Sequence, residues 1–239
     1  MSAVSRSASP VVLITGCNRG IGLELVRQYA QAGWRVYASC RRPESAQALN
    51  QIAASAEGRV SVHALDVTDP RQIKGLSELL ADTPIDVLIN NAGIDAQRDA
   101  AFGATDEERW LETLRVNVIS PLKVTEAFIK NVARGRRRVV ASLTSKMGSI
   151  GGNTTGGCYV YRSSKAALNT VMRSAAIDLR GKDITVVLVH PGWVKTDMGG
   201  PKAQIGVAES VARVRAVLDR VGIADSGRFL NFDGSVIPW

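Results

Sequence analysis

Tyr161 and Lys165 are the two side chains of this 239-residue chain best placed to do chemistry together. They are four residues apart in a long helical pattern, which puts them on one helix face, about 6 Å apart along the axis. A free tyrosine has a pKa near 10, and lowering it by ~3 units requires about 4 kcal/mol. A neighbouring ammonium group acts in that direction. Taken alone, however, the pair is more typical of an ordinary amphipathic helix surface.

A glycine turn follows the first apolar run, Val11–Thr15. It places Gly16, Gly20 and Gly22 in the pattern T-G-x-x-x-G-x-G, and the helical pattern Ile21–Ala32 begins within it. Glycines at such a position let the backbone approach a pyrophosphate, whose charge a helix N-terminus stabilises. A tight turn alone would also explain three glycines. Their place after the first strand of a βαβ unit favours a dinucleotide site.

The end of the second apolar run indicates which dinucleotide is bound. A site for NAD usually carries an acidic residue here, which binds the ribose 2′-hydroxyl. In this chain Cys40 is followed by Arg41 and Arg42, and Arg19 in the glycine turn is able to reach the same region. Guanidinium groups pair well with a phosphate. Two ordinary surface arginines are the alternative, but the missing acid and the added bases favour NADP(H) over NAD(H).

These residues are positioned by short apolar runs that alternate with longer helical patterns. The predicted strands are Val11–Thr15, Arg35–Ser39, Val60–Leu65, Val87–Asn90, Val139–Leu143, Ile184–Val189 and Arg228–Asn231. Most are continuously apolar, which is typical of strands covered on both faces of a parallel sheet. We therefore predict an α/β fold with a Rossmann-type, doubly wound parallel sheet of about seven strands, in a single domain spanning residues 1–239.

The helical patterns connect these strands. They are Ile21–Ala32, with Gly33 as its C-cap, Glu107–Val132, Tyr159–Leu179, Ala208–Val221, and two that open at Pro43 and Pro70. Proline suits a first helical turn, but inside a helix it removes a hydrogen bond. We therefore expect Pro121 to kink or interrupt the pattern Glu107–Val132.

Composition excludes several classes of protein. Hydrophobic residues make up 45% and charged residues 22%, a globular balance that excludes a disordered chain. The three cysteines are not spaced as C-x-x-C, which indicates a reduced setting, and two histidines nearly exclude a zinc site. No stretch approaches the ~18 apolar residues of a membrane span, and Val11–Ile14 is too short for a signal peptide. We expect a cytoplasmic protein without a metal or a membrane partner.

A net charge of +8 is typical of some nucleic-acid-binding proteins, and the chain contains a basic cluster, Arg134-Gly-Arg-Arg-Arg138. The cluster lies between a helical pattern and an apolar run, where a solvated connecting loop belongs. No aromatic residues alternate with it to stack on bases. We therefore expect no nucleic-acid partner, although an anionic ligand would use some of the excess charge.

Four motifs occur in the order and spacing of the short-chain dehydrogenase/reductase family, which essentially the whole chain resembles. They are Thr15-Gly16-x-x-x-Gly20-x-Gly22, Asn90-Asn91-Ala92-Gly93, Tyr161-x-x-x-Lys165 and Pro191-Gly192. More narrowly, the segments CNRGIGLELV, YVYRSSKAALN and RFLNFDGSVIPW are similar to sniffer-type carbonyl reductases and C-factor-like proteins. The resemblance also implies a homodimer or homotetramer with contacts through the two long helices.

The resemblance implies a set of cofactor contacts. Asp66 and Val67 would contact the adenine, although Asp66 also suits the start of a turn. Residues 91–93 would line the floor of the site, and residues 191–196 would meet the nicotinamide. The predicted cofactor residues are Gly16, Asn18, Arg19, Gly20, Ile21, Gly22, Arg41, Asp66, Val67, Asn91, Ala92, Gly93, Tyr161, Lys165, Pro191, Val194 and Thr196.

The resemblance further implies four catalytic residues, Asn117, Ser145, Tyr161 and Lys165. Ser145 would polarise a bound carbonyl, Tyr161 would donate the proton, and Lys165 would orient the ribose and tune Tyr161. Asn117 would hold a water that links Lys165 to solvent, with a solvated helix asparagine as the alternative. The activity implied is NADPH-dependent reduction of small ketones and aldehydes by hydride transfer, and the reverse reaction would oxidise an alcohol.

Two features of the substrate side depart from the usual family pattern. Ser145 and Tyr161 are separated by a longer gap than usual, and the stretch Gly148–Gly157 within it contains five glycines. Such a segment predicts a mobile loop beside the pocket. The lid segment Asp197–Ala203 is short, and together these features predict an open pocket with loose substrate selectivity.

One alternative comes from a different functional class. The C-factor resemblance is compatible with a signalling or regulatory protein that binds nucleotide with little turnover. A pure binding module would not need all four catalytic positions, so we favour the enzyme.

Overall fold

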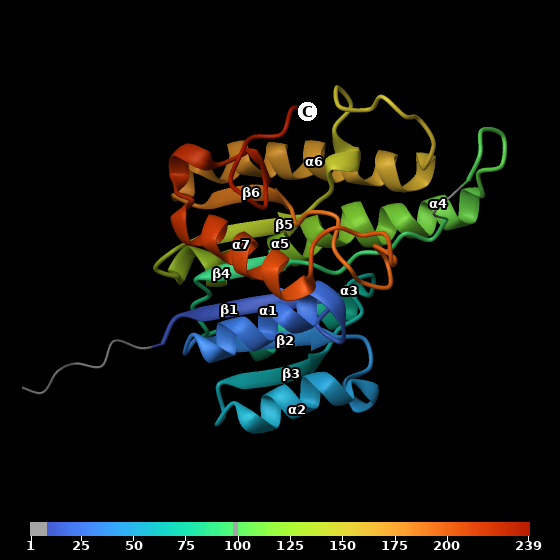
Figure 1. The fold of residues 1–239 in the computed structure, drawn as a ribbon. Helices are drawn as coiled ribbons and strands as arrows, with labels where there is room; N and C mark the ends of the chain where they lie inside the picture. The colour runs from blue at the N-terminus through green and yellow to red at the C-terminus, as the bar shows by residue number, and fades with distance from the viewer. Residues whose placement is uncertain (1–8, 98–99) are drawn as a thin grey trace, which may run out of the picture.

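The computed structural model describes residues 9–97 and 100–239. Its strands form one parallel sheet in the order β3-β2-β1-β4-β5-β6-β7 (Figure 1). The strands are β1 Val11–Thr15, β2 Arg35–Cys40, β3 Val60–Ala64, β4 Val87–Asn90, β5 Val139–Leu143, β6 Thr185–His190 and β7 Phe229–Asn231. The strand order reverses between β1 and β4, as in a doubly wound sheet. The predicted fold class is confirmed.

Helices cover both faces of the sheet (Figure 1). The α-helices are α1 Gly20–Gln31, α2 Gln47–Ser55, α3 Pro70–Leu79, α4 Glu107–Leu114, α5 Ser120–Arg134, α6 Tyr159–Leu179 and α7 Val207–Arg220. Shorter helical turns are η1 Pro43–Ser45, η2 Arg115–Ile119, η3 Lys146–Gly148, η4 Arg180–Lys182 and η5 Ile223–Asp225. Helices α1, α2 and α7 pack on one face, and α3, α5 and α6 on the other.

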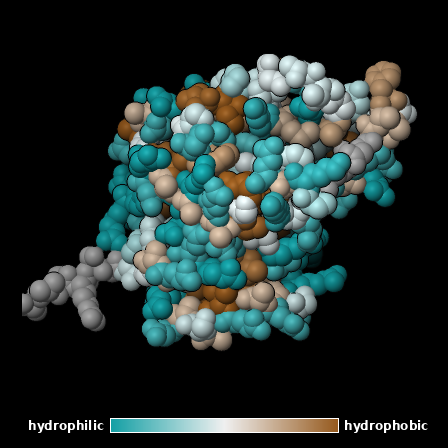
Figure 2. Space-filling view, in the orientation of Figure 1, coloured by the Kyte–Doolittle hydropathy of each residue, from teal (hydrophilic) through white to brown (hydrophobic). Residues whose placement is uncertain are grey.

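The core lies in two layers because side chains alternate along each buried strand. In β1, Val12 and Ile14 join the layer under α1 and α7, whereas Leu13 joins the layer under α5 and α6. All three are fully buried. The continuous apolar runs are therefore explained by burial on both faces. The outer sides of α1, α2 and α7 are mostly hydrophilic (Figure 2).

One helix prediction was wrong in detail, and the interruption expected near Pro121 is confirmed. Pro43 opens the short turn η1, and α2 begins only at Gln47. The interruption expected at Pro121 lies before it, where η2 is a π turn between α4 and α5. Proline has no N–H for the carbonyl four residues earlier, so the regular hydrogen-bond pattern cannot continue there. Ser120 instead donates its N–H to the oxygen of Arg115, five residues earlier.

Other boundaries differ by one or two residues. Cys40 and His190 belong to β2 and β6 because they pair with Ala64 and Asn231. Gly33 follows α1 with a φ of 80° and donates its N–H to the oxygen of Ala30, which supports its predicted role at the helix end.

Within residues 9–97 and 100–239, no helix is long and apolar enough to cross a membrane. The same residues contain no cluster of three or more side chains suited to hold a metal ion.

Candidate active site

The predicted site residues gather at the edge of the sheet where the parallel strands end. The glycine turn follows β1, Asn91 follows β4 and Ser145 follows β5. Ligands of open α/β sheets bind at this edge, beside the point where the strand order reverses.

The glycine turn is packed too closely for a larger residue at Gly16 or Gly22. A Cβ on Gly22 would overlap the oxygen of Gly16 and lie 2.5 Å from Nδ2 of Asn91. A Cβ on Gly16, whose φ is 72°, would lie 2.8 Å from Cα of Ala92. The turn and the segment after β4 are therefore in direct contact.

Asn91 and Thr15 join these two motifs by hydrogen bonds. Asn91 Nδ2 donates to the oxygens of Thr15, at 2.7 Å, and Gly16, at 2.9 Å. Oγ1 of Thr15 accepts the N–H groups of Asn91 and Ala92, both at 3.1 Å. The predicted floor residues thus position the glycine turn.

The N-terminus of α1 is open to an anion. Its N-cap residue, Arg19, makes no side-chain hydrogen bond to the helix, whereas Asp69 caps α3 and Asp106 caps α4. The first helical hydrogen bond runs from Leu23 to Arg19, so the N–H groups of residues 20–22 have no acceptor within the helix. Ile21 carries one of these groups, and Asn18 lies just before the N-cap residue. The arrangement suits a phosphate.

Basic side chains lie where a 2′-phosphate would be expected. Cys40 is buried at the end of β2, and Arg41 and Arg42 after it are exposed. Arg19 forms an ion pair at 2.8 Å with Asp197, in the segment after β6, and both side chains are more than two-thirds exposed. Arg19 is therefore shared between the glycine turn and this segment.

The segment after β6 lies against the glycine turn. A Cβ on Gly20 would lie 3.5 Å from Cγ2 of Thr196. Val194 is buried and pairs with Ile205 in a short bridge. The oxygen of Pro191 accepts the hydroxyl of Ser210 at 2.6 Å. Thr196 thus lies beside the predicted pyrophosphate residues, whereas Val194 and Pro191 are held by Ile205 and Ser210.

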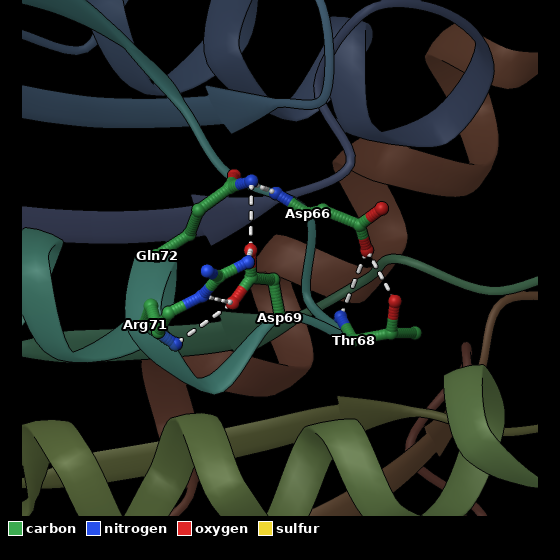
Figure 3. Close-up of polar contacts among 5 residues, drawn as sticks. All are labelled: Asp66, Thr68, Asp69, Arg71 and Gln72. Atoms are coloured by element: carbon green, nitrogen blue, oxygen red, sulfur yellow. Dashed lines mark hydrogen bonds and ion pairs between the residues drawn. The ribbon is translucent and has the colours of Figure 1, made fainter.

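Asp66 stands at the same edge, after β3, and forms a tight turn (Figure 3). Its Oδ1 accepts the N–H of Thr68 at 2.9 Å and the hydroxyl of Thr68 at 2.7 Å. Its own N–H donates to Oε1 of Gln72 at 2.7 Å. Val67 is buried in the core. The turn role considered for Asp66 is confirmed, and its contact with an adenine stays a prediction.

Tyr161 and Lys165 lie together in the first turns of α6. The Nζ of Lys165 is 5.6 Å from the ring centroid of Tyr161 and donates to the oxygen of Leu143 at 3.1 Å. Lys165 is only 5% exposed. Burial lowers the pKa of Lys165 to about 8, and the carboxylate of Asp95 opposes this shift. The pair is therefore not an exposed surface pair.

Asn117 is buried in the π turn η2 and holds the chain after β4. Its Oδ1 accepts the N–H of Ile94 at 2.9 Å, and its Nδ2 donates to the oxygen of Ile94 at 2.8 Å and to Oγ of Ser164 at 3.0 Å. A Cβ on Gly93 would lie 3.3 Å from Oδ1 of Asn117 and 3.7 Å from Nζ of Lys165. The alternative of a solvated helix asparagine is thus excluded.

Ser145 is the N-cap of the short turn η3. It is 8% exposed, and its Oγ accepts the N–H of Met147 at 3.2 Å. The turn η3 rests on α6, because a Cβ on Gly148 would lie 2.8 Å from the carbonyl carbon of Lys165. The elements that carry Ser145 and Lys165 are therefore packed together.

Sequence reasoning missed two residues of this region. Asp95 acts on Lys165 and lies two residues after the N-N-A-G motif, which was the available signal. Asn169 lies one helical turn beyond Lys165, and its side chain bonds on both sides of Ser145. The sequence shows the four-residue spacing of Asn169 from Lys165, but it does not show the contacts of Asn169 with Thr144 and Gly148.

The loop Gly148–Gly157 lies beside the site and is exposed over residues 150–156. It arches over the start of α6 in Figure 1, and its surface is pale in Figure 2 because it holds small residues of intermediate hydropathy. Its predicted mobility stays a prediction.

Comparison with known proteins agrees with this geometry. The family profile described as short chain dehydrogenase matches residues 10–205. The C-signal protein of Myxococcus xanthus is 46% identical over 65% of this chain and 93% of its own length. The carbonyl reductase Sniffer of D. melanogaster is 33% identical, with a TM-score of 0.89 over 97% of this chain and 100% of that one. An NADPH-bound carbonyl reductase from chicken fatty liver is 34% identical, with a TM-score of 0.90 over 97% and 99%.

Proposed function

The chain belongs to the short-chain dehydrogenase family, and on this premise we propose that it is an NADPH-dependent reductase of ketones and aldehydes carried by small molecules. The observation that carries the proposal is the placement of a buried Lys165 amine 5.6 Å from the Tyr161 ring. This pair lies at the same sheet edge as an uncapped helix N-terminus. A proton donor and a phosphate site thus face one region.

NADP(H) fits the residues present. The open N-terminus of α1 would hold the pyrophosphate, and Arg19 and Arg41 would pair with the 2′-phosphate. Asp66 and Val67 would contact the adenine. The nicotinamide would meet the chain between Pro191 and Thr196. The chicken relative of similar fold is NADPH-bound, which supports the same cofactor here. When bound, NADPH supplies a hydride to the carbonyl carbon.

The side chains of the site then handle the carbonyl oxygen and its proton. The hydroxyl of Ser145 donates a hydrogen bond to this oxygen, and Tyr161 gives it a proton. The ammonium of Lys165 stabilises the phenolate that remains on Tyr161. Asn117 fixes the chain beside Lys165 through its two bonds to Ile94. In this proposal it would also position a water that returns the proton.

The test is Tyr161→Phe, which removes the proton donor and keeps the ring. We expect NADPH oxidation with small carbonyls to fall by about 100-fold or more, while NADPH binding, measured by fluorescence, stays unchanged. Tyr159→Phe is the matched control, because Tyr159 lies on the same helix turn with its ring against Phe102. Unchanged turnover in Tyr161→Phe would refute the enzyme proposal.

The open pocket expected from the short lid and the loop Gly148–Gly157 belongs to this proposal. We expect several ketones and aldehydes to be reduced with similar kcat/KM. A panel in which one compound is sharply preferred would count against loose selectivity. We also propose a single domain over residues 1–239 and a cytoplasmic location. We further propose a homodimer or homotetramer that forms through α5 and α6. Size-exclusion chromatography with light scattering will test this oligomeric state.

The 46% identity to C-signal favours a second candidate, a signalling or regulatory protein that binds nucleotide with little turnover. The two candidates differ in one measurement. An enzyme oxidises NADPH only when a carbonyl compound is present. The signalling protein binds NADPH but does not oxidise it with any carbonyl compound of the panel.

A further inference from the structure

We propose that Asn169 and Ser149 are positioning residues that hold the Ser145 hydroxyl by clamping the turn η3 at both ends. Neither belongs to the four proposed catalytic residues. The inference rests on the proposed role of Ser145, and the experiment below separates the failure of one from the failure of the other.

Asn169 spans the two sides of Ser145. It lies four residues beyond Lys165 on α6 and is only 2% exposed. Its Oδ1 accepts the hydroxyl of Thr144 at 2.7 Å, and its Nδ2 donates to the oxygen of Gly148 at 3.3 Å. Thr144 immediately precedes Ser145, and Gly148 ends η3. One buried amide thus fixes the chain before and after the hydroxyl.

Ser149 ties the far end of η3 to another part of the chain. It is 1% exposed, and its hydroxyl donates to the oxygen of Pro238 at 2.6 Å and accepts the N–H of Gly152 at 3.0 Å. The N–H of Gly151 donates to the oxygen of Trp239 at 2.8 Å.

The segment that receives these bonds is itself anchored. Ile237 is buried and donates its N–H to the oxygen of Phe229 in β7, and the ring of Trp239 lies 5.6 Å from that of Phe229. In Figure 1 the end of the chain runs beside the loop that follows η3. The bonds of Ser149 therefore connect η3 to the sheet through β7.

The clamp acts on geometry because η3 rests directly on the helix that carries the proton donor. A Cβ on Gly148 would lie 2.8 Å from the carbonyl carbon of Lys165 and 2.9 Å from its oxygen. A shift of η3 therefore moves Ser145 relative to Tyr161 and Lys165. A misplacement of about 1 Å in a catalytic group is enough to cost ~100-fold in rate.

The experiment is a double-mutant cycle in the full-length protein with Ser145→Ala. Asn169→Ala and Ser149→Ala are each made in the parent and in the Ser145→Ala background, and kcat and KM are measured with NADPH and one small carbonyl. We expect each variant to lower kcat by about 10- to 100-fold in the parent with KM for NADPH within about twofold. In the Ser145→Ala background we expect a change below about twofold, because nothing remains to be positioned.

Asn131→Ala is the matched control. Asn131 is equally buried on α5 and donates to the oxygens of Leu80 and Thr83, at 2.7 and 2.9 Å, near the opposite edge of the sheet. We expect it to lower the melting temperature and leave kcat unchanged in both backgrounds.

The outcomes are distinct. Equal losses of kcat for Asn169→Ala in both backgrounds would show a general structural effect and overturn the clamp. If Ser145→Ala itself leaves kcat unchanged, the proposed role of Ser145 fails, and the clamp fails with it.

Should Asn169→Ala not fold, Thr144→Val removes the hydrogen bond between Thr144 and Asn169. Hydrogen exchange of the segment 144–149 gives a second readout: we expect it to rise about tenfold in Ser149→Ala, and an unchanged rate contradicts the clamp.

Discussion

The role proposed for Lys165 requires a charged amine at a buried position, which disfavours charge. Burial removes water from the amine and lowers its pKa to about 8, while Asp95 raises it. The amine therefore loses its proton much closer to neutral pH than an exposed lysine does. In the proposed mechanism its charge stabilises the phenolate of Tyr161, so we expect the balance between burial and Asp95 to set the range of pH in which the pair works.

We predict that carbonyl reduction falls as the pH rises through about 8, because Lys165 then becomes neutral and no longer supports proton donation by Tyr161. Neither histidine accounts for a fall near pH 8, because burial lowers the pKa of His190 to about 4 and that of His63 below its usual value. The measurement is kcat/KM against pH from 6 to 10.

Asp95→Asn sharpens this test. Loss of the carboxylate lowers the pKa of Lys165 further, so the fall in kcat/KM should move to lower pH. Glu108→Gln, an exposed change in the first turn of α4, serves as control and should leave the profile in place. A profile that stays flat up to pH 10 in the parent would contradict the assignment.

Helix α1 shows how one element is shaped for a ligand. Its N-terminus carries no capping side chain, and the glycines around it bring the backbone against Asn91 and Ala92. A side chain at Gly22 would have to displace the oxygen of Gly16. Positions 16 and 22 therefore tolerate no side chain without a shift of the turn or of the segment packed against it.

We predict that Gly22→Ala weakens NADPH binding at least about tenfold, since the added Cβ forces the glycine turn apart. Gly75→Ala is the matched control, because Gly75 lies in α3 with nothing within 4 Å of an added Cβ. This second change should leave binding unchanged and stabilise the fold by about 0.5–1 kcal/mol, the usual preference of a helix for alanine. Fluorescence titration and urea unfolding measure the two effects, and tight NADPH binding by Gly22→Ala would show that the turn does not cradle the phosphates.

At the same scale, the sequence predicts the elements that depend on local patterns and misses those that depend on distant contacts. The strands were predictable from their continuous apolar runs. The gathering of the four motifs was predictable because the ends of parallel strands meet at one edge of the sheet. The π turn at η2 was not, since Pro121 marks an interruption but not where it begins. The clamp on η3 was not either, because Ser149 and Pro238 are 89 residues apart in the chain.

Across the whole molecule, some basic side chains form ion pairs within the fold, and such pairs leave the net charge of +8 unchanged. Arg137 pairs with Asp219 and Arg138 with Asp183, so the basic cluster after α5 is engaged with neighbouring elements. The exposed Arg41 and Arg42 stand instead at the ligand-binding edge of the sheet. The location of the charge, more than its total, favours a phosphorylated dinucleotide over a polyanion.

This leads to a prediction that requires no turnover and so applies whether the protein is an enzyme or a signalling protein. A ligand that binds only the folded state at 100 times its Kd stabilises it by about 2.7 kcal/mol, which is roughly 5–10 °C in Tm for a chain of this size. We expect NADPH to give such a shift and NADH, at the same concentration, a clearly smaller one. Replacing Arg41 and Arg42 together by alanine should bring the NADPH shift closer to that of NADH, with Arg19 still in place, and leave the NADH shift unchanged. Arg220→Ala, an exposed arginine at the end of α7, is the control for loss of charge. Equal shifts with NADH and NADPH in the parent protein would show that these arginines do not select the 2′-phosphate.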